Sequence, residues 1–295
     1  MIRVLGTVFA ALMGLAFGSF LNVCLTRWPA GESIVKPRSH CRNCGRTLAW
    51  WENVPVVSWL ALRGRCRTCG AWIGWRYLIV ELSVAGIWAY LVWRLLGAYI
   101  LNLPSIQSGA NPPAYLPAAE TVGGMFLSWV LIGLAVLDAE HFWLADAATI
   151  PGTVFGLVSI TLFAAEELGW ANPQTWLLIG FRILGCAAAA GLILLIRWVY
   201  KLIRHREGLG LGDAKLMAML AAWLGLPGAL LSFAIGVVLG SLAALILLGR
   251  RKKPEGAESW AAAKLPLGTF LCIGGIVASL WGQPIIAAYL RWAGF

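Results

Sequence analysis

Long apolar stretches alternate with short polar segments along the whole chain. A helix that crosses a membrane needs roughly 20 consecutive apolar residues, and about eight stretches approach or exceed that length. The third and sixth are short, so we expect them to be tilted or extended through their polar flanks, and seven spans also fit the pattern. The pattern predicts an all-α polytopic membrane protein with about eight transmembrane helices. The stretches cover residues 4–25, 78–101, 122–137, 148–165, 176–196, 214–226, 229–248 and 266–289.

Composition supports this class and excludes a soluble domain. Hydrophobic residues make up 60% of the 295 residues, charged residues only 12%, and tryptophan occurs 17 times. Such a composition is typical of chains that expose apolar side chains to lipid. The first stretch runs into Asn22 and Arg27 without a small-residue cleavage site, which favours a retained span over a removed signal peptide.

Lysine and arginine are distributed unevenly among the polar segments. Residues 26–76, 197–215 and 250–264 hold nine, five and five of the 23, whereas residues 102–121 and 166–175 hold none. Cytoplasmic loops collect Lys and Arg, so the basic segments are predicted to face the cytoplasm and the N-terminus to face outward. We interpret the net charge of +10 as a topology signal that anionic membrane lipid strengthens. We expect no nucleic-acid binding.

Two acidic residues lie where predicted spans meet the cytoplasm. Asp138 closes the third span and Asp213 opens the sixth, so both are expected on the same side of the membrane. Ionisable groups at such depth usually serve chemistry or transport. If the fold brings these carboxylates together they share a proton and titrate as a pair, which is the chemistry of aspartic proteases. Gly210 and Gly212 allow a substrate backbone to approach closely.

Other interpretations of these acids remain open. An aspartate at the start of a helix, such as Asp213, is often only an N-cap. Glu140 and Asp146 lie in the same short segment as Asp138, so either of them could be the partner of Asp213 in its place. A proton-coupled transporter would also place acids in its spans, and a non-enzymatic assembly scaffold would need neither acid.

Four cysteines form a second constellation of candidate functional residues. Cys41 and Cys44 make one Cys-x-x-Cys pair, and Cys66 and Cys69 make another after 21 residues. Two such pairs indicate a structural, tetrahedral Zn²⁺ site. Disulfides are the alternative, although a cytoplasmic loop is reducing. We therefore expect three parts in the chain: a first span over 1–25, a cytoplasmic four-cysteine zinc-binding domain over 26–76, and a transmembrane domain with the acids over 77–295.

Several short motifs together resemble one family over nearly the whole chain. They lie at residues 18–23, 37–39, 41–44, 52–60, 62–67, 66–69, 76–77, 80–81, 207–216 and 221–225. The chain is similar to the type IV prepilin peptidases, the bifunctional leader peptidases and N-methyltransferases of bacterial pilus and type II secretion systems. Two positions depart from the usual family pattern: Ala145 and Arg42 replace prolines.

The resemblance implies a GxGD-type aspartic peptidase of the bacterial inner membrane, with the site facing the cytoplasm. It assigns the two catalytic acids to Asp138 and Asp213. It implies that the substrates are prepilins or pseudopilins, cut after a glycine that ends a basic leader. It also implies methylation of the new N-terminal residue from S-adenosylmethionine. We further expect Glu140 and Asp146 to attract the basic leader.

Overall fold

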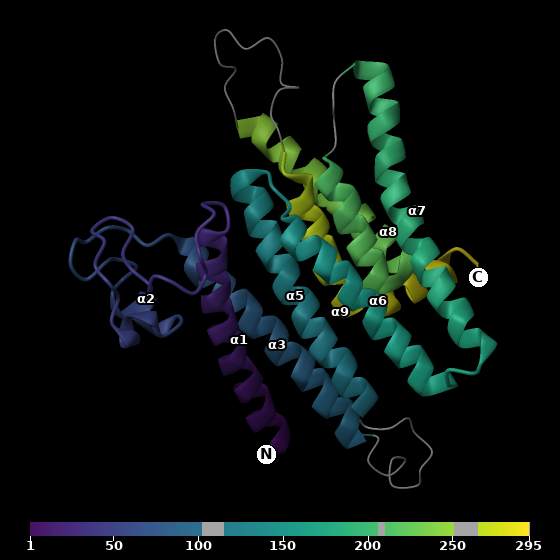
Figure 1. Ribbon diagram of the computed structural model, residues 1–295, viewed down its shortest axis with the longest axis horizontal. Helices are drawn as coiled ribbons and strands as arrows, with labels where there is room; N and C mark the ends of the chain where they lie inside the picture. The colour runs from purple at the N-terminus through teal and green to yellow at the C-terminus, as the bar shows by residue number, and fades with distance from the viewer. Residues whose placement is uncertain (102–114, 206–209, 251–264, 295) are drawn as a thin grey trace. The chain divides into compact units, whose positions relative to one another are not determined.

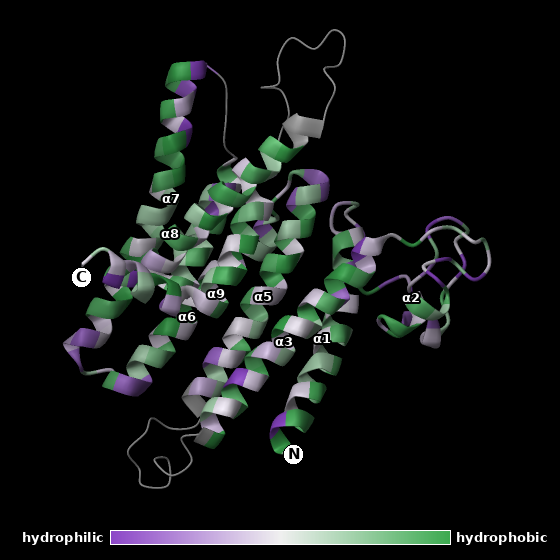
Figure 2. Cartoon of the chain, turned by 180° about the vertical axis from the view of Figure 1, so that it is seen from behind, coloured by the Kyte–Doolittle hydropathy of each residue, from purple (hydrophilic) through white to green (hydrophobic). Residues whose placement is uncertain are grey.

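The computed structural model describes residues 1–101, 115–205, 210–250 and 265–294, and every regular element in this part of the chain is a helix (Figure 1). Seven helices in it are long and apolar enough to cross a membrane, and Figure 2 shows how hydrophobic residues dominate them. The predicted all-α membrane fold is therefore confirmed. The seven are α1 (Ile2–Arg27), α3 (Trp75–Leu101), α5 (Tyr115–His141), α6 (Asp146–Leu168), α7 (Pro173–Arg204), α8 (Leu211–Arg250) and α9 (Leu267–Trp292).

The difference between eight predicted stretches and seven helices comes from α8. This helix contains both the sixth and the seventh stretch, and it is broken at Gly225, whose φ of 74° and ψ of 171° are not helical. Such a backbone conformation suits glycine because it has no Cβ. The third stretch, which is short in the sequence, gains length from its polar flanks and becomes the 27-residue α5.

The two arms of α8 run in opposite directions from Gly225. A Cβ on Gly240, in the second arm, would lie 3.3 Å from the Phe270 ring near the start of α9. The first arm begins near the same end of α9, because Leu144 lies close to both Gly212 and Gly268. Figure 1 likewise shows both ends of α8 on one side. The break therefore brings Asp213 to the level at which α9 starts.

Packing divides the chain into two compact units, Met1–Gly133 and Leu134–Phe295. In the first unit, α1 and α3 pack closely through small residues. A Cβ on Gly14 would lie 2.7 Å from the Cα of Ala85, and one on Gly18 would lie 2.7 Å from the Cα of Glu81. Small residues at such spacing let two membrane helices approach closely.

A segment with little regular structure joins α1 to α3 within the first unit. It holds the 3₁₀ helix η1 (Trp50–Asn53) and the short helix α2 (Val57–Ala61), and Figures 1 and 2 draw it beside α1 of the same unit. The Arg27 guanidinium donates to the carbonyls of Ser33 and Pro37 at 2.8 and 2.6 Å. These bonds fix the start of the segment to the end of α1.

In the second unit, the first arm of α8 is held by α6 and α7. The Trp223 indole N–H donates to the Gly152 carbonyl of α6 at 2.8 Å. Arg182 of α7 donates to the Trp223 carbonyl at 3.5 Å, so a cation lies where this arm ends and its carbonyls lack partners. The break at Gly225 therefore has support on both sides.

The described residues do not test three of the predictions: the division of the chain into three parts, the first half of the glycine-rich motif, and part of the basic segments. The three-part division at residues 25 and 76 stays a prediction. Glu207, Gly208 and Leu209 of the glycine-rich motif lie outside the described residues, as do Arg206 and the basic residues of 251–264.

Candidate active site and metal centre

Asp138 lies in the last turn of α5 and is 7% exposed. Its Oδ2 atom accepts a hydrogen bond from the Thr269 backbone N–H at 2.7 Å and lies 3.2 Å from the Thr269 hydroxyl. Gly268 permits this approach, because a Cβ there would lie 2.9 Å from Oδ2. The carboxylate thus caps the first turn of α9, whose own N-cap, Pro266, makes no side-chain bond.

Asp213 lies in the first turn of α8 and is 8% exposed. Its Oδ2 atom accepts the Gly210 backbone N–H at 3.1 Å. An acidic side chain that reaches back to the residue before its helix is half of a capping box. Gly212 fits closely against Leu144, 3.0 Å from where its Cβ would lie. Of the two glycines predicted to admit a substrate, Gly212 therefore also lets this turn pack tightly.

The two acids belong to one site within the second unit. Leu144 lies against both of them: a Cβ on Gly268 would lie 2.9 Å from both Asp138 Oδ2 and a Leu144 methyl carbon, and a Cβ on Gly212, next to Asp213, would lie 3.0 Å from Leu144. Each carboxylate lies against the start of a helix, Asp213 against its own helix α8 and Asp138 against α9, where the macrodipole and unpaired N–H groups favour negative charge. Burial opposes two simultaneous charges. The structure therefore holds two carboxyl groups together with one oxygen of each bound to a backbone N–H.

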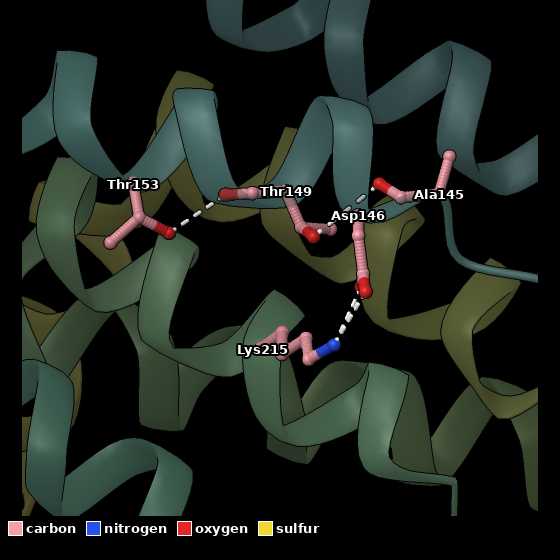
Figure 3. Close-up of polar contacts among 5 residues, drawn as sticks. All are labelled: Ala145, Asp146, Thr149, Thr153 and Lys215. Atoms are coloured by element: carbon pink, nitrogen blue, oxygen red, sulfur yellow. Dashed lines mark hydrogen bonds and ion pairs between the residues drawn. The ribbon is translucent and has the colours of Figure 1, made fainter.

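Asp146 and Glu140 lie near this chain segment but are exposed. Both Asp146 oxygens lie 2.7 Å from the Lys215 Nζ, and the two side chains are 57% and 43% exposed (Figure 3). Glu140 is exposed and lies 3.9 Å from the His141 Nε2. An exposed ion pair contributes little to stability. Asp138 and Asp213 are thus buried, whereas Asp146 and Glu140 are exposed.

The start of α6 shows why Asp146 points outward. Its first residues follow Ala145, the extended N-cap, and the Thr149 hydroxyl lies 3.4 Å from the Ala145 carbonyl. One turn on, the Thr153 hydroxyl donates to the Thr149 carbonyl at 2.8 Å (Figure 3). Thr149 therefore occupies the buried side of this turn, and the exposed Asp146 pairs with Lys215.

Thr269 and Gly268 are site residues that the sequence analysis missed. They follow Pro266 at the start of the last apolar stretch. The signal there was only that of a helix start. Nothing in the local pattern indicated that an acid 131 positions earlier in the chain would bind this turn.

The four predicted zinc ligands lie together in the first unit. The Sγ atoms of Cys41, Cys44, Cys66 and Cys69 lie within 4.8 Å of one another, and those of Cys41 and Cys69 are 3.7 Å apart. Tetrahedral Zn–S bonds of about 2.3 Å require sulfur atoms roughly 3.8 Å apart. All seven cysteines are free thiols. The donor set therefore fits a structural zinc ion.

Each cysteine pair is built on the same turn. The Gly45 N–H donates to the Cys41 carbonyl and the Gly70 N–H to the Cys66 carbonyl, both at 2.9 Å. These glycines have φ of 70° and 68°, in the left-handed region that glycine adopts readily. In the second turn, backbone N–H groups of Cys69 and Thr68 lower the pKa of the Cys66 thiol to about 6. The lower pKa favours the thiolate form of Cys66, which is the form that binds a metal ion.

A partly buried ion pair supports the cysteine cluster. Arg46 donates to Glu52 at 2.6 Å, and the second oxygen of Glu52 accepts the Ala49 N–H at 2.8 Å. These bonds hold the pKa of Glu52 below its usual value. Glu52 therefore fixes the loop that follows the first pair of cysteines.

Comparisons with known proteins agree over both units. Residues 12–95 match the family described as Bacterial Peptidase A24 N-terminal domain, and residues 125–245 match the Type IV leader peptidase family. The chain is 31% identical to a prepilin leader peptidase/N-methyltransferase of Stutzerimonas stutzeri, over 96% of this chain and 93% of that protein. It is also 31% identical to the protein of the same description from Pseudomonas aeruginosa, with the same coverage, and 35% identical to that of Myxococcus xanthus, over 88% and 69%. No solved structure matches the chain.

Proposed function

Because the chain belongs to the type IV leader peptidase family, we propose that it cleaves the basic leader of prepilins or pseudopilins after glycine, with Asp138 and Asp213 as the catalytic pair. The observation that carries this proposal is the burial of these two acids, each with one oxygen bound to a backbone N–H. Two carboxyl groups in such surroundings share one proton. The family assignment and the chemistry of the site thus support the same reaction.

The reaction follows from the different protonation of the two acids. The ionised aspartate takes a proton from water, and the water oxygen bonds to the carbonyl carbon of the scissile glycine. The protonated aspartate meanwhile donates to the carbonyl oxygen. A proton then passes to the leaving nitrogen, the C–N bond breaks, and one water has been added across the peptide bond. An extended substrate backbone would lie beside Asp213 along Gly210 and Gly212, although the Cβ position of Gly212 is itself filled by Leu144.

The proposed site faces the cytoplasm of a multi-pass inner-membrane protein. This orientation rests on the Lys and Arg content of residues 26–76, 197–215 and 250–264. A prepilin would lie with its apolar helix in the bilayer and its basic leader in the cytoplasm. The membrane boundary would then place the junction between leader and helix at the level of the two acids.

The second activity is methylation of the new N-terminal residue, often phenylalanine, with S-adenosylmethionine as methyl donor. Its support is that relatives of the chain are described as prepilin leader peptidase/N-methyltransferases. Cys41, Cys44, Cys66 and Cys69 would hold a zinc ion that keeps residues 40–70 in shape. Zinc in a site with four protein ligands has a structural role.

Glu140 and Asp146 would attract the basic leader by their charge. Lys215 already pairs with Asp146, so a leader lysine or arginine would have to compete with it. Charge reversal of both acids should raise KM for a basic leader most strongly at low salt. An unchanged KM would remove this part of the proposal.

Cleavage of a prepilin with a Gly-Phe junction tests the central assignment. The purified full-length protein in detergent is compared with Asp138→Asn, Asp146→Asn and Asp213→Asn, each checked for folding by thermal melting. Activity should be lost in the first and third variants and kept in the second. A dead Asp146→Asn with an active Asp138→Asn would move the first acid to Asp146. If the wild type never cleaves, a transporter or an assembly scaffold becomes the better explanation.

A further inference from the structure

The first turn of α9 is bonded to the acid pair through Thr269. This residue is the third of the helix that begins at Leu267, so its N–H has no acceptor within the helix. That N–H donates to Asp138 Oδ2 at 2.7 Å instead. The turn therefore holds the carboxylate with a group that a helix start leaves unpaired.

The Thr269 hydroxyl lies between two oxygen atoms of α5. It is 3.2 Å from Asp138 Oδ2 and 3.0 Å from the Ala135 carbonyl oxygen. A hydroxyl has one proton and two lone pairs, so it can donate to only one of these atoms at a time. Which atom receives the proton depends on whether Asp138 is ionised.

Both protonation states of Asp138 can be satisfied without moving a heavy atom. When the carboxylate is ionised, the Thr269 hydroxyl donates to Oδ2. When a proton is on Oδ2, the carboxyl group donates to the Thr269 oxygen, and the hydroxyl proton turns to the Ala135 carbonyl. The hydrogen bond between the two side chains is thus kept while its direction reverses.

We propose that Thr269 is a positioning residue for the reaction: its hydroxyl holds Asp138 in one place as that acid loses and gains the shared proton. The inference rests on the proposed peptidase function. A catalytic group must stay within a fraction of an ångström of its productive position. An acid that changes charge needs a partner that can both donate and accept, and a backbone N–H can only donate.

A purely structural role for Thr269 makes a different prediction. Valine has nearly the same shape as threonine and fills the same space, but it has no hydroxyl. If the side chain only packs the start of α9, Thr269→Val keeps the turnover rate. If the hydroxyl positions Asp138, Thr269→Val lowers the turnover rate, and Thr269→Ser, which keeps the hydroxyl, has a rate close to that of the wild type.

The experiment measures kcat and KM of the full-length protein on a prepilin with a Gly-Phe junction. We expect Thr269→Val to lower kcat by about tenfold or more, since one hydrogen bond to a charged group is lost. KM should stay unchanged, because Thr269 is proposed to act through Asp138, to which it is bonded. Thr269→Ser should stay close to the wild type in both constants.

The matched control is Thr161→Val. The Thr161 hydroxyl donates to the Leu157 carbonyl of its own helix, α6, at 2.7 Å, so this variant makes the same Thr-to-Val change and loses a hydroxyl hydrogen bond that does not involve the acid pair. Its kcat should equal that of the wild type. A control with the same loss as Thr269→Val would show a general effect of removing a helix hydroxyl and would overturn the proposal.

Two further results would overturn it. One is wild-type kcat in Thr269→Val, and the other is equal impairment of the valine and serine variants. If Thr269→Val melts far below the wild type, Thr269→Ala provides the same comparison, and if alanine also fails to fold the role is structural. Failure of the peptidase function would look different, because Asp138→Asn would then cleave or the wild type would not.

Discussion

The cysteine cluster and the acid pair are assembled in different ways. The cluster takes all its sulfur atoms from residues 41–69, and two copies of one turn build it. The acid pair takes its groups from α5, α8 and α9, with Asp138 bonded to Thr269 across 131 positions. The first site depends on local turns and a metal ion, whereas the second depends on how distant helices pack. Changes in one should therefore leave the other intact.

Removal of one acid should give the largest effect. Asp213→Asn is expected to lower the rate of prepilin cleavage by about a thousandfold or more, as loss of a central catalytic group does in other proteases. Zinc content should not change, because the cluster lies in the other unit. Cleavage assays with metal analysis of the same sample check both statements. A variant that loses zinc as well as cleavage would show that the two sites are not independent.

Removal of two zinc ligands should have the opposite effect: loss of zinc, with cleavage kept by the protein that still folds. Cys66→Ser combined with Cys69→Ser is expected to release the metal and lower the yield of folded protein, because metal binding contributes folding free energy. Residual folded protein should still cleave. Cys186→Ser is the control, since Cys186 is buried in α7 outside the cluster. A metal-free variant with full yield and stability would contradict the structural role of zinc.

The break in α8 at Gly225 should give a smaller effect, confined to the second unit. Gly225→Ala should destabilise the second unit by about 1–3 kcal/mol, because its backbone conformation is almost restricted to glycine. A Cβ there would also lie 3.0 Å from the Arg182 guanidinium. Gly191→Ala is the matched control, since nothing lies within 4 Å of its Cβ position. Thermal unfolding should show the loss at Gly225 only, with cleavage reduced and zinc retained.

Acid should weaken the cysteine loop slightly through Glu52. The folded-state pKa of Glu52 is held below the ordinary value of 4.5 by Arg46 and the Ala49 N–H. Its contribution to stability is therefore complete above the unfolded pKa and is lost as pH falls through the folded pKa. Melting curves from neutral pH down through the acid range should show this component in the wild type and not in Glu52→Gln. Equal acid sensitivity of both would exclude Glu52 as its source.

The sequence predicted the membrane class and the positions of most helices, because apolar stretches of spanning length have few other structures available in a bilayer. It also predicted the four cysteines as one cluster, which the structure confirms. The proximity of Asp138 and Asp213 was expected only on the condition that the fold brought them together. The roles of these acids as catalysts, and of Glu140 and Asp146 as substrate contacts, stay predictions.

Sequence by itself determined what is local: helix-forming stretches, the charge bias between segments and the two cysteine turns. Each depends on residues a few positions apart, whose chemistry acts over one turn or one span. Only the tertiary structure decided that α8 folds back at Gly225, that Asp146 pairs with Lys215, and that Thr269 binds Asp138. These contacts join helices that are distant in the chain, and hydrophobic periodicity carries no information about which helix faces which.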